Sequence, residues 1–77
     1  MKFRLTTAYT NNINEQPFNN YITDLTNAGL DITTQNNKCY ITLNTLDDLQ
    51  ELSRITQNDI IFDSDNNTLT IYDYYME

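Results

Sequence analysis

Polar and apolar residues alternate at the start of the chain, which predicts a strand with one buried face. This strand covers "KFRLTTAY", residues 2–9, and its polar side chains lie on the opposite face. The apolar side of the predicted strand is formed by Phe3, Leu5 and Tyr9. The polar stretch "TNNINEQ" that follows predicts a connecting loop.

Apolar residues then recur at the spacing of an amphipathic helix. Pro17 suits the first turn of this helix, because the N–H group that proline lacks has no partner there. Gly29 stands just after the last apolar position, where a residue with left-handed backbone often ends a helix. The predicted buried stripe consists of Phe18, Tyr21, Ile22, Leu25 and Ala28.

A second helix is predicted from Thr45 onward. Thr45 and Asp48 resemble a capping box, with Asp in place of the usual Glu or Gln. Asn58 is the expected C-cap of this helix. Its expected buried stripe consists of Leu46, Leu49, Leu52 and Ile55.

Each helix is followed by a predicted hairpin. Asn36 and Asn37 form the expected two-residue turn of the first hairpin, and Ser64–Asn67 form the loop of the second. In this register Cys39 faces the core. The register also places large apolar residues in facing pairs, which are Ile32 with Ile41, Leu30 with Leu43, Ile60 with Ile71, and Phe62 with Leu69.

The helix and hairpin patterns repeat along the chain. A shift of 28 residues aligns Asp31 with Asp59, and it also aligns Phe18 with Leu46. Because 77 residues leave no room for a second core, the chain is expected to form one domain over residues 1–77.

The predicted order of elements is β(αββ)(αββ), with the two helix–hairpin repeats at about 16–43 and 44–73. We expect an α+β fold with a mainly antiparallel five-stranded sheet and two helices packed on one face. The other face of the sheet should be open to water. The strand residues expected beneath the helices are Phe3, Leu5, Ile32, Ile41, Ile60, Phe62 and Ile71.

The composition disfavours enzymatic chemistry. Histidine is absent, and Cys39 and Gly29 are the only cysteine and glycine. These counts exclude an internal disulfide, a Cys/His zinc site and a glycine-rich phosphate loop. The carboxylates are expected at turns, helix starts and outward strand positions, where they stay ionised and do not act as general acids. We predict no enzymatic activity, no cofactor and a structural role for the thiol.

The segment "DSDNN" has a partial resemblance to a calcium-binding loop. Asp63, Asp65 and Asn67 match the first three ligand positions of an EF-hand, but Thr68 and Tyr74 replace its glycine and its bidentate glutamate. The flanking residues predict strands. We therefore favour a hairpin turn and predict no metal site.

The expected location is the cytoplasm of a bacterial host. A single cysteine is typical of a reducing compartment, and no apolar run approaches the ~20 residues of a membrane span. The bias toward Asn, Ile and Tyr is typical of AT-rich coding sequences, such as those of low-GC bacteria and their phages.

The net negative charge comes entirely from the second part of the chain. The net charge is −7; residues 1–43 sum to zero, and residues 44–77 hold eight carboxylates against Arg54 alone. Carboxylates near helix starts or on edge strands are also common for structural reasons, so each single acid has a second explanation. The collective excess favours a basic protein partner, whereas the few cations argue against nucleic acid.

Tyrosines near the C-terminus extend this pattern, because Tyr combines a large contact area with a hydrogen-bonding tip. We therefore predict an acidic and aromatic partner-binding surface. Its residues are Asp47, Asp48, Glu51, Asp59, Asp63, Asp65, Tyr72, Asp73, Tyr74 and Tyr75.

A small acidic chain with the segments "DDLQE" and "DIIFDSDNNTLTIYDYYME" resembles phage-encoded anti-CRISPR proteins. The resemblance implies a stoichiometric inhibitor of a bacterial defence nuclease, of which a type II-A Cas nuclease is the expected target. RNA-guided nucleases hold DNA in positively charged channels, so carboxylates can take the place of phosphates there and act as a DNA mimic.

Two other functions remain open from the sequence. The first is a small phage or bacterial structural or assembly protein that self-associates through the open sheet face or an edge strand. The second is sequestration of a small ligand by an oligomer. The sequence allows a monomer or a homodimer.

Overall fold

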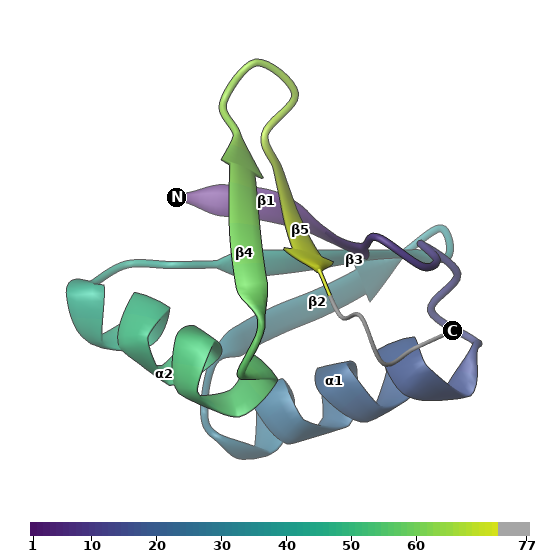
Figure 1. Cartoon of the computed structure of the whole chain (residues 1–77), viewed down its shortest axis with the longest axis horizontal. Helices are drawn as coiled ribbons and strands as arrows, with labels where there is room; N and C mark the ends of the chain where they lie inside the picture. The colour runs from purple at the N-terminus through teal and green to yellow at the C-terminus, as the bar shows by residue number, and fades with distance from the viewer. Residues whose placement is uncertain (73–77) are drawn as a thin grey trace.

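A computed structural model of the chain describes residues 1–72, and it has the predicted order of elements (Figure 1). We call α1, β2 and β3 the first unit, and α2, β4 and β5 the second unit. The elements are β1 Lys2–Thr7, α1 Gln16–Asn27, β2 Asp31–Gln35, β3 Lys38–Thr42, α2 Leu46–Thr56, β4 Asp59–Asp63 and β5 Thr68–Tyr72.

The five strands form one mixed sheet in the order β2-β3-β1-β5-β4. β1 is the central strand, and it runs antiparallel to β3 and parallel to β5. The two hairpins supply the remaining pairs, and both are antiparallel. The predicted α+β fold with a mainly antiparallel five-stranded sheet is therefore confirmed, and β1 joins the two units.

The hairpin registers follow the prediction. Ile32 faces Ile41 in the first hairpin, and both predicted pairs of the second hairpin, with Ile60 facing Ile71, are present. Asn36 and Asn37 have φ angles of 53° and 62°. Two positive φ angles in a two-residue loop define a type I′ turn, whose twist matches that of the flanking strands.

Leu30 and Leu43 do not form a pair in the sheet. β2 begins only at Asp31 and β3 ends at Thr42. Leu43 pairs instead with the start of the chain, since its backbone N–H donates to the carbonyl of Met1 at 2.7 Å. The sheet therefore ends one residue earlier than the apolar pattern indicates.

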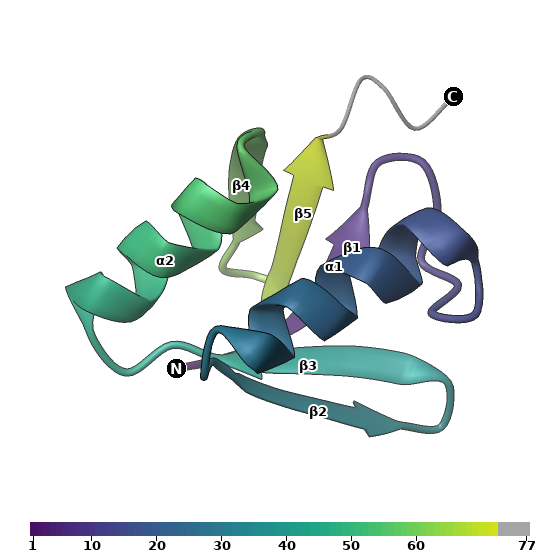
Figure 2. The same ribbon diagram turned by 90° about the horizontal axis from the view of Figure 1, so that it is seen from below.

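The core lies between the sheet and the two helices, which lie on the same side of the strands in Figures 1 and 2. Inward positions of β1, β3 and β5 alternate with outward ones, as expected for a sheet with one buried face. The helices contribute Phe18, Leu25 and Leu52 to the same cluster. The buried apolar residues are Phe3, Leu5, Phe18, Leu25, Leu30, Cys39, Ile41, Leu52, Leu69 and Ile71.

Three residues that were expected in the core are exposed. Tyr9 is 52% exposed because β1 ends at Thr7, whose hydroxyl accepts a hydrogen bond from the Thr10 N–H group at 2.9 Å and turns the chain. Leu46 is 78% exposed at the first position of α2. Phe62 is 42% exposed because it lies on β4, an edge strand.

Smaller corrections concern the edges of the sheet and the helix ends. Ile32 and Ile60 are only half-buried, since both outer strands are edges. Ala28 is exposed at the C-cap of α1. The C-cap of α2 is Gln57, with a left-handed φ of 54°, and not Asn58.

Candidate functional site

The acidic start of α2 combines structural and free carboxylates. The Asp48 carboxylate accepts hydrogen bonds from the backbone N–H groups of Asn44 at 2.8 Å and Thr45 at 3.3 Å. The Thr45 hydroxyl in turn accepts from the Asp48 N–H group at 3.2 Å, which completes the predicted capping box. Asp47 is exposed, and its side chain makes no hydrogen bond or ion pair with any described residue. Asp47 is therefore the free acid of this turn.

Glu51 is the one acid of the second unit that has a cationic partner within residues 1–72. Its carboxylate pairs with the Arg54 guanidinium one turn later. The hydrogen bond from Arg54 lowers the pKa of Glu51 below its usual range. Exposed pairs at this spacing stabilise a helix only slightly, and they are weakened by salt.

The β4–β5 loop folds around the carboxylate of Asp63. This carboxylate accepts hydrogen bonds from the Asn66 side-chain amide at 2.8 Å and from the backbone N–H groups of Asn66 and Asp65 at 3.3 and 3.0 Å. These donors, led by the Asn66 side chain, lower the pKa of Asp63. Asp65 is exposed, and its side chain is unpaired among the described residues.

The same loop joins two antiparallel strands, so its geometry is that of the predicted hairpin and not that of a helix–loop–helix calcium site. Within residues 1–72, no three acidic or cysteine side chains gather in a metal-binding arrangement.

The remaining predicted positions lie at the other end of the second unit. Asp59 is exposed at the start of β4, opposite Tyr72 at the end of β5. Because side chains alternate along a strand, Asp59 and Asp63 point to the face of the sheet opposite that of Ile60. The predicted Asp73, Tyr74 and Tyr75 lie outside the described residues. The acids therefore surround the edge formed by α2 and β4, and they do not share one flat face.

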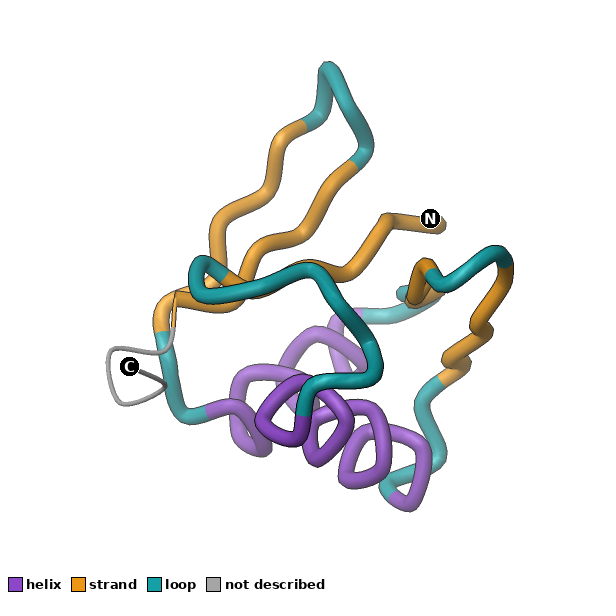
Figure 3. Tube along the Cα trace, turned by 90° about the vertical axis from the view of Figure 1, so that its right-hand side faces the viewer, coloured by secondary structure: helices purple, strands orange, loops and turns teal. Residues whose placement is uncertain are grey.

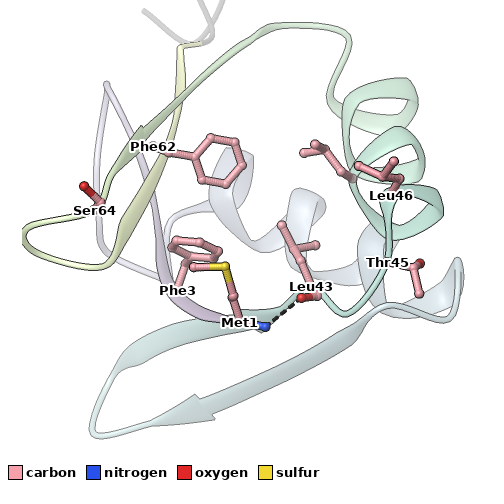
Figure 4. A pocket seen from close by; sticks show the side chains of 8 residues that line it. Met1, Phe3, Leu43, Thr45, Leu46, Phe62 and Ser64 are labelled. Carbon is pink, nitrogen blue, oxygen red and sulfur yellow. Dashed lines mark hydrogen bonds between the residues drawn. The ribbon is translucent and has the colours of Figure 1, made fainter.

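An apolar groove separates α2 from the β4–β5 hairpin (Figure 4). It has a volume of about 360 Å³. Three of the five exposed large hydrophobic residues among residues 1–72, namely Met1, Leu46 and Phe62, line it. The other lining residues are Phe3, Leu43, Thr45, Leu49 and Ser64.

The groove was missed by the sequence prediction because Leu46 and Phe62 were assigned to the core. Their positions in the repeats gave no sign that the space between them stays open. The Phe62 ring packs edge-to-face on the buried Phe3 ring, with centroids 5.1 Å apart. This contact fixes one wall of the groove.

Acidic residues stand at both borders of the groove. Asp47 follows Leu46 on the helix border, and Asp65 follows Ser64 on the hairpin border, whereas the Asp63 side chain points to the other face of the sheet. Figures 1 and 3 show that the hairpin loop projects away from both helices. In this loop Asp65 is exposed and Asp63 is half-buried.

The cations of the first part of the chain do not neutralise these acids. Lys2 and Arg4 are on the outward positions of β1, and the Lys2 ammonium lies 5.0 Å from the centroid of the Tyr40 ring. At this distance a cation interacts favourably with the face of an aromatic ring. The single ion pair among residues 1–72 is that of Arg54 with Glu51.

The lone thiol is part of the core. Cys39 is buried beside Leu5, and burial raises its pKa from 9.0 to about 11. A thiol in this state is a weak nucleophile at neutral pH. This environment favours the predicted structural role.

Comparison of the chain with protein-family models, curated proteins and solved structures gives no match. No described helix has the length and apolar character needed to cross a membrane.

Proposed function

We propose that the protein binds a cationic surface of another protein through the edge formed by α2 and β4. The observation that supports this proposal is the unneutralised charge of the second unit. Residues 46–72 hold six carboxylates and one guanidinium. Three of these acids, Asp47, Asp59 and Asp65, are exposed, and their side chains make no ion pair or hydrogen bond with described residues.

The proposed activity is stoichiometric inhibition of a nucleic-acid-binding enzyme of bacterial defence, of the anti-CRISPR type. Such a nuclease holds its DNA in a positively charged channel. Asp59 and Asp63 stand about 13 Å apart along one strand, since each strand residue advances ~3.3 Å. Carboxylates at this spacing, with those of α2, would compete with phosphates for Lys and Arg. Long-range attraction would make association fast and sensitive to salt.

A pair of charge-reversal variants tests the proposal. The first variant combines Asp47→Lys, Asp59→Lys and Asp65→Lys in the second unit. The matched control combines Glu15→Lys, Asp24→Lys and Asp31→Lys, which changes the net charge by the same amount outside that unit. We expect the first variant to lose at least ~100-fold in inhibition, because several close charge pairs each contribute more than 1 kcal/mol.

The readout is DNA cleavage by a guide-loaded type II-A Cas nuclease at increasing inhibitor concentration, with circular dichroism as the check of folding. The control should stay within about fivefold of the unaltered protein. Equal losses in both folded variants would contradict recognition by the second unit. No inhibition by the unaltered protein, with no basic protein captured from host lysate at low salt, would contradict the proposal as a whole.

A second candidate function is self-association in an assembly. The observation that favours it is Ile61, which is 52% exposed on the edge strand β4. Unpaired edge strands can pair with another copy, although the flanking Asp59 and Asp63 oppose this. Sedimentation over a dilution series tests it. A dimer that persists in 0.5 M salt and is lost with Ile61→Lys would favour this candidate.

A further inference from the structure

The apolar groove between α2 and the β4–β5 hairpin exposes side chains that a folded protein usually buries. Met1 and Leu46 are 76% and 78% exposed, and both face the same space as Phe62. An exposed apolar patch with a polar border commonly marks a protein-binding site. We propose that this groove binds a large apolar side chain that lies between lysines or arginines on a segment of the partner protein.

The size of the groove fits such a side chain. An apolar cavity of ~150 Å³ holds a benzene molecule, and this groove measures about 360 Å³. It can therefore take an indole ring or a pair of aliphatic side chains, but not the whole face of a helix.

The walls of the groove combine a rigid and an adaptable part. Phe3 is buried in the central strand, and its ring supports Phe62 at 5.1 Å. Beside Phe3, Met1 is held by its ammonium group, which donates to the Leu43 carbonyl at 2.7 Å (Figure 4). The unbranched Met side chain can adjust to the shape of an incoming group.

The position of Leu46 in its helix differs from that of Phe18. The sequence repeat aligns the two residues, but Leu46 is the first residue of α2, whereas Phe18 is the third residue of α1. Phe18 is fully buried, whereas Leu46 leaves the core and borders the groove. In our proposal, the partner supplies the apolar contact that Leu46 lacks.

Charge complementarity decides which kind of segment carries that side chain. No carboxylate lines the groove, but exposed acids adjoin its lining residues on two sides, with Asp47 next to Leu46 and Asp65 next to Ser64. Flanking lysines or arginines on the ligand would therefore meet acids on either border. A second copy of this chain fits poorly, because it would place two acidic edges against each other. The sign of the partner's charge rests on the proposed function above.

A short peptide tests the groove without knowledge of the natural partner. The probe is Lys-Lys-Leu-Trp-Lys-Lys with blocked ends, and its indole is a clean fluorescent reporter because the protein contains no tryptophan. In the first control peptide, Ala-Ala replaces Leu-Trp, and a terminal dye reports binding. In the second control peptide, glutamate replaces all lysines. We expect a blue shift of the Trp emission on binding, and weaker or no binding of both controls.

Two matched variants locate the binding site. Leu46→Ser should weaken binding of the probe about tenfold, the effect of leaving one large aliphatic contact unmade. Ile61→Ser removes an exposed aliphatic side chain from the outward position of β4 and should change binding less than twofold. Backbone amide shifts of the unaltered protein should move at residues 46 and 62 when the probe is added.

Three results would overturn the proposal. They are no binding of the probe to the unaltered protein, equal effects of Leu46→Ser and Ile61→Ser, and a dimer that Leu46→Ser dissociates. A failure of the groove proposal is distinguishable from a failure of the proposed function, because the proposed function is tested by inhibition and by the charge-reversal variants. If charge reversal abolishes inhibition but the probe peptide does not bind the groove, the groove proposal fails and the proposed function still stands.

Discussion

The two helix–hairpin units have the same topology but differ in charge. Residues 16–42 of the first unit contain two carboxylates and one lysine, whereas residues 46–72 contain six carboxylates and one arginine. Both units place their second strand beside β1. Because the first unit builds the same elements with little charge, the fold itself does not require the excess of acids in the second unit, although Asp48 and Asp63 make structural hydrogen bonds. This comparison separates the charge from the architecture.

The interiors of the two units are more alike than their surfaces. Leu5 of the central strand lies between Cys39 of β3 and Leu69 of β5. Since β3 and β5 run in opposite directions on either side of β1, the register has an approximate two-fold axis at Leu5, normal to the sheet. Selection for packing would preserve the inner positions, so the acidic outer positions of one unit require another explanation.

The largest expected difference between the units concerns Phe18 and Leu46, which the repeat aligns. Phe18 is fully buried, so Phe18→Ala should reduce the free energy of unfolding by about 3–5 kcal/mol. Leu46 is 78% exposed, so Leu46→Ala should change the free energy of unfolding by less than about 0.5 kcal/mol. Urea denaturation of both variants measures the contrast. A large loss for Leu46→Ala would mean that the groove is closed in solution and would restore the equivalence of the two residues.

A second difference separates Cys39 from its counterpart Leu69, because only the thiol can ionise. Burial raises the pKa of Cys39 from 9.0 to about 11. The folded state therefore holds the proton more tightly than the unfolded state does. The resulting stability is complete below pH ~9 and is lost as the pH rises through 11, by up to ~2–3 kcal/mol.

Urea denaturation between pH 8 and 11 tests this difference, with Cys39→Val as the matched control. Tyrosines also ionise in this range, but they do so equally in both proteins. We expect the unaltered protein to lose more stability than the control between pH 8 and 11, so the difference between the two curves should change by up to ~2–3 kcal/mol. Parallel curves would show that the thiol reaches solvent in the folded state.

The sequence was sufficient for the local elements of both units. Period-two and helical spacing located the strands and helices, and the Asn36-Asn37 pair fixed the register of the first hairpin. Each of these signals depends on residues that are close along the chain. The parallel pairing of β1 with β5 joins Arg4 to Thr68, and no local pattern encodes a contact at such a distance. The strand order was therefore not predictable.

The candidate site was predictable only in part, for the same reason. Acidic positions can be read directly, but the groove depends on how Leu46 and Phe62 approach each other across the fold. Periodicity tells which face a side chain occupies, and it does not tell whether another element covers that face. The buried Thr7 was also missed, although the alternation of Phe3 and Leu5 continues to that position. At Thr7 the periodicity of the strand is a better guide to burial than the polar character of the side chain.

The smallest expected difference lies at the starts of the two helices. The Thr45 side chain caps α2, whereas Glu15 at the N-cap of α1 makes no side-chain capping bond. Thr45→Ala should therefore reduce the free energy of unfolding by about 1 kcal/mol, and Glu15→Ala by less than about 0.5 kcal/mol. Thermal and urea denaturation of the two variants give both values. Losses below about 0.5 kcal/mol in both variants would show that water replaces the Thr45 hydroxyl at the Asp48 N–H group at no cost, and that this half of the capping box does not stabilise α2.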